Sequence, residues 1–499
     1  MRDTFQKTFI KILIAYCIAL VLCRVTHGQI AVGVFVVGLL FAATRKIGYA
    51  WGAYLMLMVL VMLNPLVFPR QGALFSLSVR FGVLMLGGLL VCVGNNRIAH
   101  AKPPMGLMCL FLICASVSAS EGWVPAISYL KLVNFSVFFF GVWLGVRGLA
   151  SNPDNIVKVR AAFLAFAVIV IFGSAALVPF PGLSTLRGLR TVVATTGVGE
   201  MNFSVVSDVG AGINVGSGGS YFCGILAHSQ ALAPILACLI TYLLCDYLFI
   251  KKGKSWLHLV LIGAAFPLLF YTRSRTGLLA MLVGIGTLYI YSARKIALPP
   301  VVKRRLSQSM LYGAILLLIV AAVAEAVDGK MSKWIRKTDA ASADDRGLVE
   351  AVTSSRMGLI DKTMYEFNRN PLFGSGFQVE EFHQDLWRRS NSLVLTAPIE
   401  KGLLVLMVLG ETGLVGACVF YAFLIVFITG CIRKRYCCTL TLFMVQLATN
   451  FGEATYFSPG GIGGIIWVLC IVGGWVLDLH LRRENDFVNW GRMRINYAN

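Results

Sequence analysis

The chain has 499 residues, of which 58% are hydrophobic and only 13% are charged, and its formal net charge is +21. A soluble chain of this length would divide into domains with polar surfaces and with about a quarter of its residues charged, so the composition excludes an ordinary soluble protein. The apolar runs are continuous rather than alternating, which argues against a transmembrane β-barrel. Most runs are close to the ~20 residues that a helix needs to cross the hydrocarbon core of a bilayer.

The apolar runs predict an all-α polytopic membrane protein with 12–14 transmembrane helices. The first run follows Arg2, Lys7 and Lys11 and has no small-residue cleavage site after it, so we expect an uncleaved first helix. The apolar stretch 402–409 is too short to cross, and we expect it to dip into the membrane or lie on it. The predicted spans are residues 8–25, 30–44, 48–64, 80–94, 105–119, 126–147, 160–180, 225–249, 255–272, 275–293, 309–327, 410–430, 437–452 and 460–479.

The positive charge follows the predicted topology. With the N-terminus inside and a change of side at each span, more than half of the 44 basic residues fall on the inside, but only about a quarter of the 23 acidic residues do. This pattern is typical of a bacterial inner-membrane protein and predicts that both termini are cytoplasmic. The net charge therefore reflects a lipid bilayer as partner and does not indicate nucleic acid.

Two external segments are too long to be simple connectors. Residues 181–224 are rich in Gly, Ser, Thr and Val, and residues 328–409 carry charges of both signs, with an imperfect helical period that predicts surface helices over 347–369. The absence of an internal repeat argues modestly against transporters that are built from two related halves. The predicted division is N-terminal helices at 1–180, a Gly-rich periplasmic loop at 181–224, central helices at 225–327, a large periplasmic loop at 328–409, and C-terminal helices with a cytoplasmic tail at 410–499.

Cysteine and histidine spacing does not predict a metal site. Most of the 13 cysteines lie in or beside apolar runs, where cysteine behaves as a small hydrophobic residue. The 6 histidines are scattered and zinc-type spacing is absent, so the sequence predicts no metal and no cofactor.

A short turn at 272–277, predicted to be external, contains two arginines that could bind an anion. Its sequence, Thr272-Arg-Ser-Arg-Thr-Gly277, places Arg273 and Arg275 between two apolar spans. Guanidinium groups bind phosphate oxygens in pairs and stay charged at any relevant pH, so this turn suits a phosphate ligand. The alternative is that both arginines extend to the lipid interface as anchors, and spacing alone gives that alternative slightly more weight.

Three motifs in order resemble the bacterial O-antigen ligase and polymerase superfamily. The turn and the residues after it, up to Gly284, resemble the family's Ser-Arg-Gly/Thr-x-Leu-Leu segment. Ser355-Arg356 followed by Asn370-Pro-Leu-Phe-Gly-Ser-Gly-Phe377 is similar to its Arg and Pro-Leu-Phe-Gly-x-Gly. Gly410-Glu-Thr-Gly-Leu-Val-Gly416 looks like the Glu-x-Gly-x-x-Gly that opens the next helix. The resemblance covers about residues 265–430.

The resemblance implies a GT-C-like membrane glycosyltransferase. Members of the family take a glycan from undecaprenyl diphosphate on the periplasmic side and pass it to a hydroxyl of another glycan, or of lipid A core, without metal or nucleotide. The resemblance also implies a chain-length regulator as a further partner. Motif matching implies that Arg273, Arg275 and Arg356 bind the diphosphate. Other residues on the family motifs are Gly374, Gly376, Asn391, Glu411 and Gly413.

The general base is where this chain departs from the family. Ligases carry a His next to an Asn before the Glu-x-Gly helix, whereas the similar place here reads Ser390-Asn391-Ser392. His383 is the one histidine of the large loop and its only side chain that titrates near neutral pH, so it is a candidate base, against the plainer interpretation of an idle surface histidine. Glu400 is the second candidate, at the start of the apolar stretch where burial would raise a carboxyl pKa; its alternative is a surface ion pair.

The favoured function is a glycan polymerase, because the missing His-Asn pair departs from the ligase pattern. An O-antigen ligase acting on lipid A core is the nearest alternative. A transporter or flippase is an alternative of another class, but it has less need for a loop as long as 328–409. A receptor or scaffold would not need the arginine turn.

Overall fold

Helices form almost all of the regular structure in the described part of the chain, as the sequence predicted. The computed structural model describes residues 2–26, 30, 33–34, 36–38, 47–60, 62–64, 67–68, 105–149, 153–180, 185–186, 221–226, 229–250, 255–272, 274–295, 360–361, 363–379, 403–452, 455–457, 459 and 462–483. The predicted spans 80–94 and 309–327, and most of 30–44, lie outside these residues. Each of the other predicted spans contains a described helix.

The helices have the lengths and composition of a multi-pass membrane protein. Within the described residues, six are long and apolar enough to cross a membrane and five shorter ones are apolar. Their bounds are α1 Arg2–Val25, α3 Ile47–Leu60, α5 Met105–Glu121, α6 Pro125–Leu149, α7 Pro153–Ala175, α10 Ser229–Cys245 with the π-helical turn η2 Asp246–Ile250, α11 Trp256–Tyr271, α12 Arg275–Lys295, α17 Leu404–Arg433, α18 Cys437–Thr449, and α19 Ile462–Trp467 with the π-helical turn η3 Val468–Gly473.

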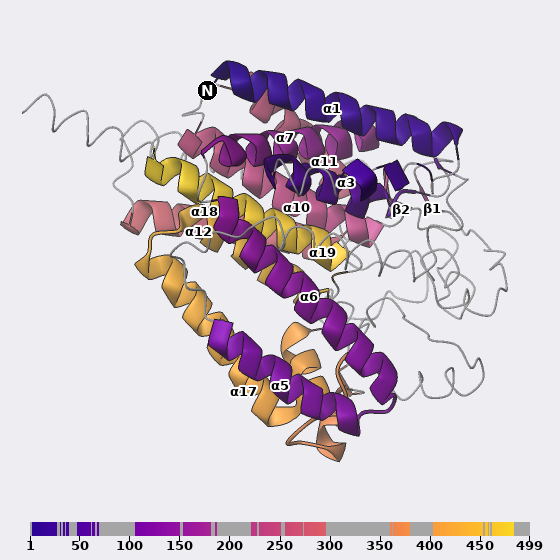
Figure 1. The fold of residues 1–499 in the computed structure, drawn as a ribbon, viewed down its shortest axis with the longest axis vertical. Coiled ribbons are helices and arrows are strands. Elements are labelled where there is room, and N and C mark those ends of the chain that lie inside the picture. The colour runs from indigo at the N-terminus through magenta and orange to yellow at the C-terminus, as the bar shows by residue number, and fades with distance from the viewer. Residues whose placement is uncertain are drawn as a thin grey trace, which may run out of the picture.

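The helices pack into a bundle with α1 at one edge and the pair α5 and α17 at the opposite edge (Figure 1). Small residues let the central helices approach closely, as is common where lipid rather than water surrounds the bundle. On α12, a Cβ at Gly277 would lie 2.9 Å from the Cβ of Ala233 on α10. One at Gly284 would clash with Val445 on α18 and lie 3.0 Å from Thr241 on α10. The N-terminal part of α12 is therefore fixed between α10 and α18.

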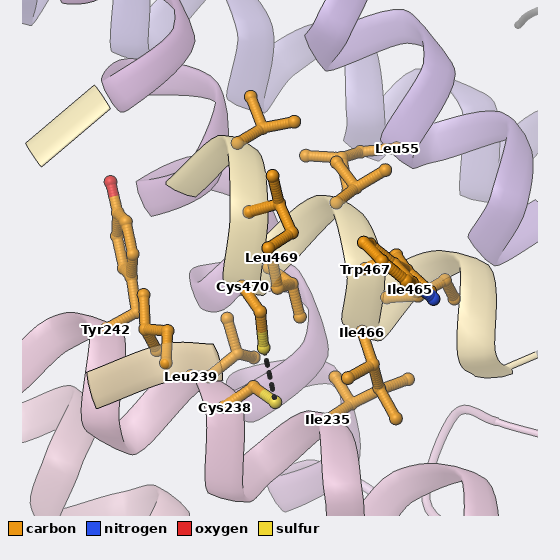
Figure 2. Close-up of a cluster of buried hydrophobic side chains, with 14 of the residues drawn as sticks. Leu55, Ile235, Cys238, Leu239, Tyr242, Ile465, Ile466, Trp467, Leu469 and Cys470 are labelled. Atoms are coloured by element: carbon orange, nitrogen blue, oxygen red, sulfur yellow. Dashed lines mark hydrogen bonds between the residues drawn. The ribbon is translucent and has the colours of Figure 1, made fainter. Parts of the chain in front are cut away.

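The core is continuous across α3, α10, α19 and η3. Figure 2 shows Leu55 of α3 and Tyr242 of α10 in the same buried cluster as Trp467 of α19. Cys238 of α10 and Cys470 of η3 are both fully buried, and their Sγ atoms are 3.6 Å apart (Figure 2). Among the described residues, no cysteine forms a disulfide bond.

Two short strands bring the ends of the segment 181–224 together. β1 Thr185–Leu186 pairs antiparallel with β2 Tyr221–Phe222. Just beyond β2, the Asn64 amide Nδ2 donates to the Gly224 carbonyl oxygen (2.9 Å), and the Asn64 backbone N–H donates to Ile225 (2.8 Å). Cys223 is buried beside Asn64, and this burial raises the pKa of its thiol to about 12. The segment therefore leaves and re-enters the bundle at one place.

A charged cluster is buried where α7, η2 and α11 meet. Asp246 is fully buried, and Arg160 Nε donates to its Oδ1 at 2.9 Å. His258 Nε2 lies 3.0 Å from Asp246 Oδ2, and Ser255 Oγ lies 2.7 Å from His258 Nδ1. Because a carboxylate only accepts hydrogen bonds, Nε2 of His258 carries the donated proton. Arg160 begins the predicted span 160–180 and Asp246 lies near the end of the predicted span 225–249, and the structure joins these two ends.

We expect Asp246→Ala to lower the free energy of unfolding by about 3–5 kcal/mol, because it leaves the Arg160 guanidinium buried without its counter-ion. Thermal unfolding of the detergent-solubilised protein measures the effect. The double substitution of Arg160→Met with Asp246→Leu should recover most of the lost stability, because it removes both charges at similar volume. If the double variant unfolds as early as Asp246→Ala, the uncompensated charge is not the cause.

Candidate active site

Helix α17 is broken at Gly413. Gly413 has φ 63° and ψ −170°, a combination that only glycine adopts readily, so α17 is two helical segments rather than one. The prediction of a span that opens at 410 with Glu411 at its start is wrong in this respect. The helix begins at Leu404, takes in most of the apolar stretch 402–409, and buries Glu411 inside it. The break interrupts the helical ladder and leaves backbone groups on both sides that need other partners.

The loop 370–376 supplies those partners. Its backbone lies across the break and hydrogen-bonds to both halves of α17. The four bonds are Ser375 N to Gly410 O (3.0 Å), Gly376 N to Glu411 O (3.2 Å), Leu414 N to Pro371 O (2.8 Å) and Val415 N to Leu372 O (3.3 Å). Buried backbone groups outside a helix need hydrogen-bond partners, and this loop supplies them. The Pro-Leu-Phe-Gly-x-Gly and Glu-x-Gly-x-x-Gly motifs therefore form one structural unit.

Glycines allow the backbone of the loop 370–376 to lie in contact with the backbones of α17 and of the α5–α6 turn. Gly374 and Gly376 have φ of 79° and 111°, in the region that favours glycine. A Cβ at Gly374 would clash with the Glu411 backbone and lie 2.6 Å from Gly413 N. One at Gly376 would lie 2.8 Å from Gly122 Cα in the turn between α5 and α6. Three backbones thus meet within contact distance, and side chains at these positions would separate them.

Side chains of α5 and α6 hold the loop in place. Ser118 donates through Oγ to the Glu411 carbonyl oxygen and accepts from Gly376 N at 3.1 Å. Ser128 Oγ donates to Phe377 O at 2.9 Å, and Lys131 Nζ donates to Gln378 O at 2.7 Å. With the backbone bonds to α17, these contacts anchor residues 370–378 to three helices, so this segment is a fixed part of the bundle.

The turn between α11 and α12 carries the one predicted diphosphate ligand that the structure describes. Arg275 is the first residue of α12 and is half-buried. Ser274 caps this helix, because its Oγ accepts from Gly277 N at 3.2 Å. A cation at the positive end of a helix is unfavourable by about 0.3–1 kcal/mol, whereas an anion there is favoured. The start of α12 therefore suits an anionic ligand, and Arg275 adds a positive charge there.

The arginine turn and the broken helix lie at the same end of the bundle. A Cβ at Gly452, just after α18, would clash with Thr276 in the first turn of α12. Two residues earlier, Asn450 O accepts from Leu404 N at 3.0 Å, which ties the start of α17 to the end of α18. From Leu404 to Glu411 the helix rises about 10 Å, at 1.5 Å per residue. The turn and the break are therefore close enough for one extended ligand to reach both.

A cavity of about 260 Å³ opens beside the loop 370–376. It lies between the α5–α6 turn and the short helix 363–369, part of the predicted surface-helix region. The Arg369 guanidinium stacks 4.2 Å from the centre of the Trp123 ring, and Asn370 Nδ2 donates to Glu121 Oε2 at 2.9 Å. The polar and aromatic residues that line the cavity are Glu121, Trp123, Glu366, Arg369, Asn370 and Ser375.

The structure brings part of the predicted site together. Gly374, Gly376, Glu411 and Gly413 meet at the break, and Arg275 lies at the same end of the bundle. The other predicted site residues lie outside the described residues: Arg273, Arg356, His383, Asn391 and Glu400.

Sequence reasoning missed the cavity beside the loop. Its two walls are about 245 residues apart in the chain, and no periodic pattern relates Glu121 to Glu366. The available signal was local: Trp123 sits in a three-residue turn between two spans, and Arg369 directly precedes the Asn-Pro-Leu-Phe-Gly motif.

Comparison with known proteins agrees with the resemblance seen in the motifs. Residues 260–421, about a third of the chain, match the family described as O-antigen ligase. The matched segment contains the arginine turn, the loop 370–376 and the break in α17. No curated protein and no solved structure matches the chain.

Proposed function

Because residues 260–421 belong to the O-antigen ligase family, we propose that the protein is a membrane glycosyltransferase that polymerises or transfers undecaprenyl-diphosphate-linked glycan on the periplasmic face of the bacterial inner membrane. The family match is the observation that carries the proposal. The multi-pass helical architecture supports it, because a polyprenyl-linked substrate stays in the bilayer. The product is a surface polysaccharide, either O-antigen or exopolysaccharide.

The proposed reaction is an inverting transfer without metal. The acceptor hydroxyl oxygen bonds to the anomeric carbon of the donor sugar. The bond from that carbon to the diphosphate oxygen breaks with its electron pair, and the hydroxyl proton passes to a base. Negative charge develops on the departing diphosphate, so positive charge fixed beside it lowers the barrier. We assign this role to Arg275, with Arg273 and Arg356 completing the site.

The base remains the one predicted from sequence. We propose His383 in this role, with Glu400 as the second candidate, both contributed by the large loop 328–409. The broken helix gives that loop a fixed attachment next to the arginine turn. In this arrangement the loop delivers the base and Arg356 to a diphosphate that Arg275 holds at the bundle end.

The topology and the division of the chain are part of the proposal. Both termini are cytoplasmic, and the loops 181–224 and 328–409 are periplasmic between the helical segments 1–180, 225–327 and 410–499. The acceptor is a second glycan or lipid A core, and a chain-length regulator is a further partner. Polymerase activity is favoured over ligase activity because Ser390-Asn391-Ser392 lacks the ligase histidine.

One assay tests the function. Purified protein in detergent, given undecaprenyl-diphosphate oligosaccharide and no nucleotide sugar, should release undecaprenyl diphosphate and form longer glycan. EDTA should leave the rate unchanged if no metal takes part. Product that forms only with lipid A core as acceptor would establish the ligase instead. Absence of turnover under both conditions, with flux of lipid-linked sugar in sealed vesicles, would establish a transporter.

A further inference from the structure

The cavity beside the loop 370–376 has the chemistry of a sugar-binding site. Two of the residues that line it are carboxylates, and a third is an aromatic ring with an arginine stacked on it. Carboxylates accept hydrogen bonds from sugar hydroxyls, and an indole provides both an apolar face and an N–H donor. At about 260 Å³ the cavity is smaller than the usual 300–1,000 Å³ of a site for a drug-sized ligand. It therefore suits one or two sugar rings rather than a long glycan.

The charge of the cavity distinguishes it from the diphosphate site. Glu121 and Glu366 contribute two negative charges, and Arg369 contributes one positive charge. The net charge of the lining is thus −1, which repels phosphate and acidic sugars. Arg275 instead opens α12, next to Thr276, which packs against Gly452. Nearby Asn450 binds Leu404 at the start of α17, and the helix rises about 10 Å from Leu404 to Glu411 at the break. The diphosphate and the sugar in the cavity therefore occupy separate places at one end of the bundle.

Glu366 couples the cavity to the broken helix. Its side chain is buried at 4% exposure and lies in the cavity wall. Ser375 Oγ lies 3.3 Å from Glu366 Oε2 and 3.2 Å from Gly410 O, so its proton can be donated to either. Burying a carboxylate away from water costs free energy unless hydrogen bonds compensate, so a carboxylate held in a cavity wall is a candidate binding group. Glu366 is therefore in contact with the loop 370–376, which also hydrogen-bonds to α17 at its break.

We propose that this cavity is the acceptor subsite, which binds an uncharged terminal sugar of the acceptor glycan through Glu366, Glu121 and Trp123. The assignment to the acceptor rests on the proposed function, and the binding of a neutral sugar does not. The Glu366 carboxylate accepts hydrogen bonds from ring hydroxyls, and the Trp123 indole packs against the ring. The acceptor hydroxyl then faces the anomeric carbon of a donor whose diphosphate is held at Arg275.

The test uses the repeat-unit oligosaccharide of the producing strain, released from its lipid by mild acid so that it carries no phosphate. With lipid-linked donor at saturation, Glu366→Gln and Trp123→Ala should each raise the KM for this acceptor by about tenfold or more, as expected for loss of a hydrogen bond to a charged group or of an aromatic contact. The KM for the donor should stay within about twofold of the parent value. Calorimetric titration of the same oligosaccharide into donor-free protein should show the same loss of affinity.

Asp361→Asn is the matched control, because Asp361 is an exposed acid on the same short stretch and does not line the cavity. It should leave both KM values and the affinity unchanged. An unchanged acceptor KM and affinity in Glu366→Gln and Trp123→Ala would overturn the acceptor subsite while leaving the transferase intact. If the parent protein binds the oligosaccharide but transfers nothing, the proposed function fails and the sugar site stands. A larger loss for the lipid-linked donor than for the free acceptor would move the cavity to the donor side and overturn its assignment.

Discussion

Replacing Gly413 with alanine should lower the free energy of unfolding by about 4 kcal/mol or more and abolish turnover. Alanine at this position would have to keep a φ of 63° with a ψ of −170°, which an L side chain rarely adopts. Its Cβ would also clash with the Leu372 carbonyl group and lie 2.5 Å from Phe373 N. These contacts are with backbone, so no side-chain rotation relieves them.

The expected loss of stability is large because the loop 370–376 and helix α17 provide hydrogen-bond partners for each other's backbone groups. Displacing the loop breaks the four backbone hydrogen bonds that join residues 370–376 to the two halves of α17. Each buried backbone group left without a partner costs about 1–3 kcal/mol, and more where lipid replaces water. If α17 straightened into one continuous helix, its own backbone N–H and C=O groups would be hydrogen-bonded again. It would also expel the loop that positions the large segment 328–409, so activity should be lost even where protein is still recovered.

Gly430→Ala is the matched control for this prediction. Gly430 lies in the same helix, and a Cβ there would meet nothing within 4 Å. Alanine is favoured over glycine inside a helix by about 1 kcal/mol, so this variant should be as stable as the parent or slightly more so. Thermal unfolding in detergent and recovery from membranes measure both variants. Equal unfolding temperatures for Gly413→Ala and Gly430→Ala would show that the break does not matter for stability.

The helices were predictable from sequence because the signal is strong and local. A run of about 20 apolar residues has few alternatives in a bilayer, and the predicted spans that the structure describes each contain a helix. The break in α17 was not predictable in the same way. Gly410, Gly413 and Gly416 look alike in sequence, and only the structure singles out Gly413, by its φ of 63° and its contact with the Leu372 backbone.

The candidate site was predicted partly from residue chemistry and partly from resemblance. Arg275 was singled out because two arginines share a short turn between apolar spans, and the resemblance then placed that turn in a family motif. Residues such as Glu121 and Glu366 acquire a common role only when the loop 370–376 is placed against the α5–α6 turn, and no spacing rule encodes a contact over that distance in the chain. Buried Asp246 is a second case, since its partners Arg160 and His258 come from two other helices.

Arg275→Ala should lower turnover about 100-fold, as is usual when one group that stabilises charge in the transition state is removed. The unfolding temperature should change little, because the contacts of this half-buried side chain are offset by its position at the N-terminus of α12, where a positive charge opposes the helix dipole. Arg433→Ala is the matched control, because Arg433 is an exposed arginine at the far end of α17. It should leave turnover unchanged and lower the free energy of unfolding by no more than about 0.3–1 kcal/mol, because its charge lies at the favourable C-terminal end of α17.

Arg275→Lys distinguishes the diphosphate ligand from a simple interfacial anchor. Lysine keeps the charge and extends to the lipid interface as arginine does, so an anchoring role predicts full activity in this variant. A diphosphate ligand uses the planar fork of donors, which lysine lacks, so turnover should stay well below the parent value. Inhibition by farnesyl diphosphate, a soluble stand-in for the leaving group, should weaken in both Arg275 variants and be unchanged in Arg433→Ala. If Arg275→Ala retains normal turnover and normal inhibition, the diphosphate is bound elsewhere. The break in α17 and the cavity beside it would then have to be reconsidered as a site that acts without this arginine turn.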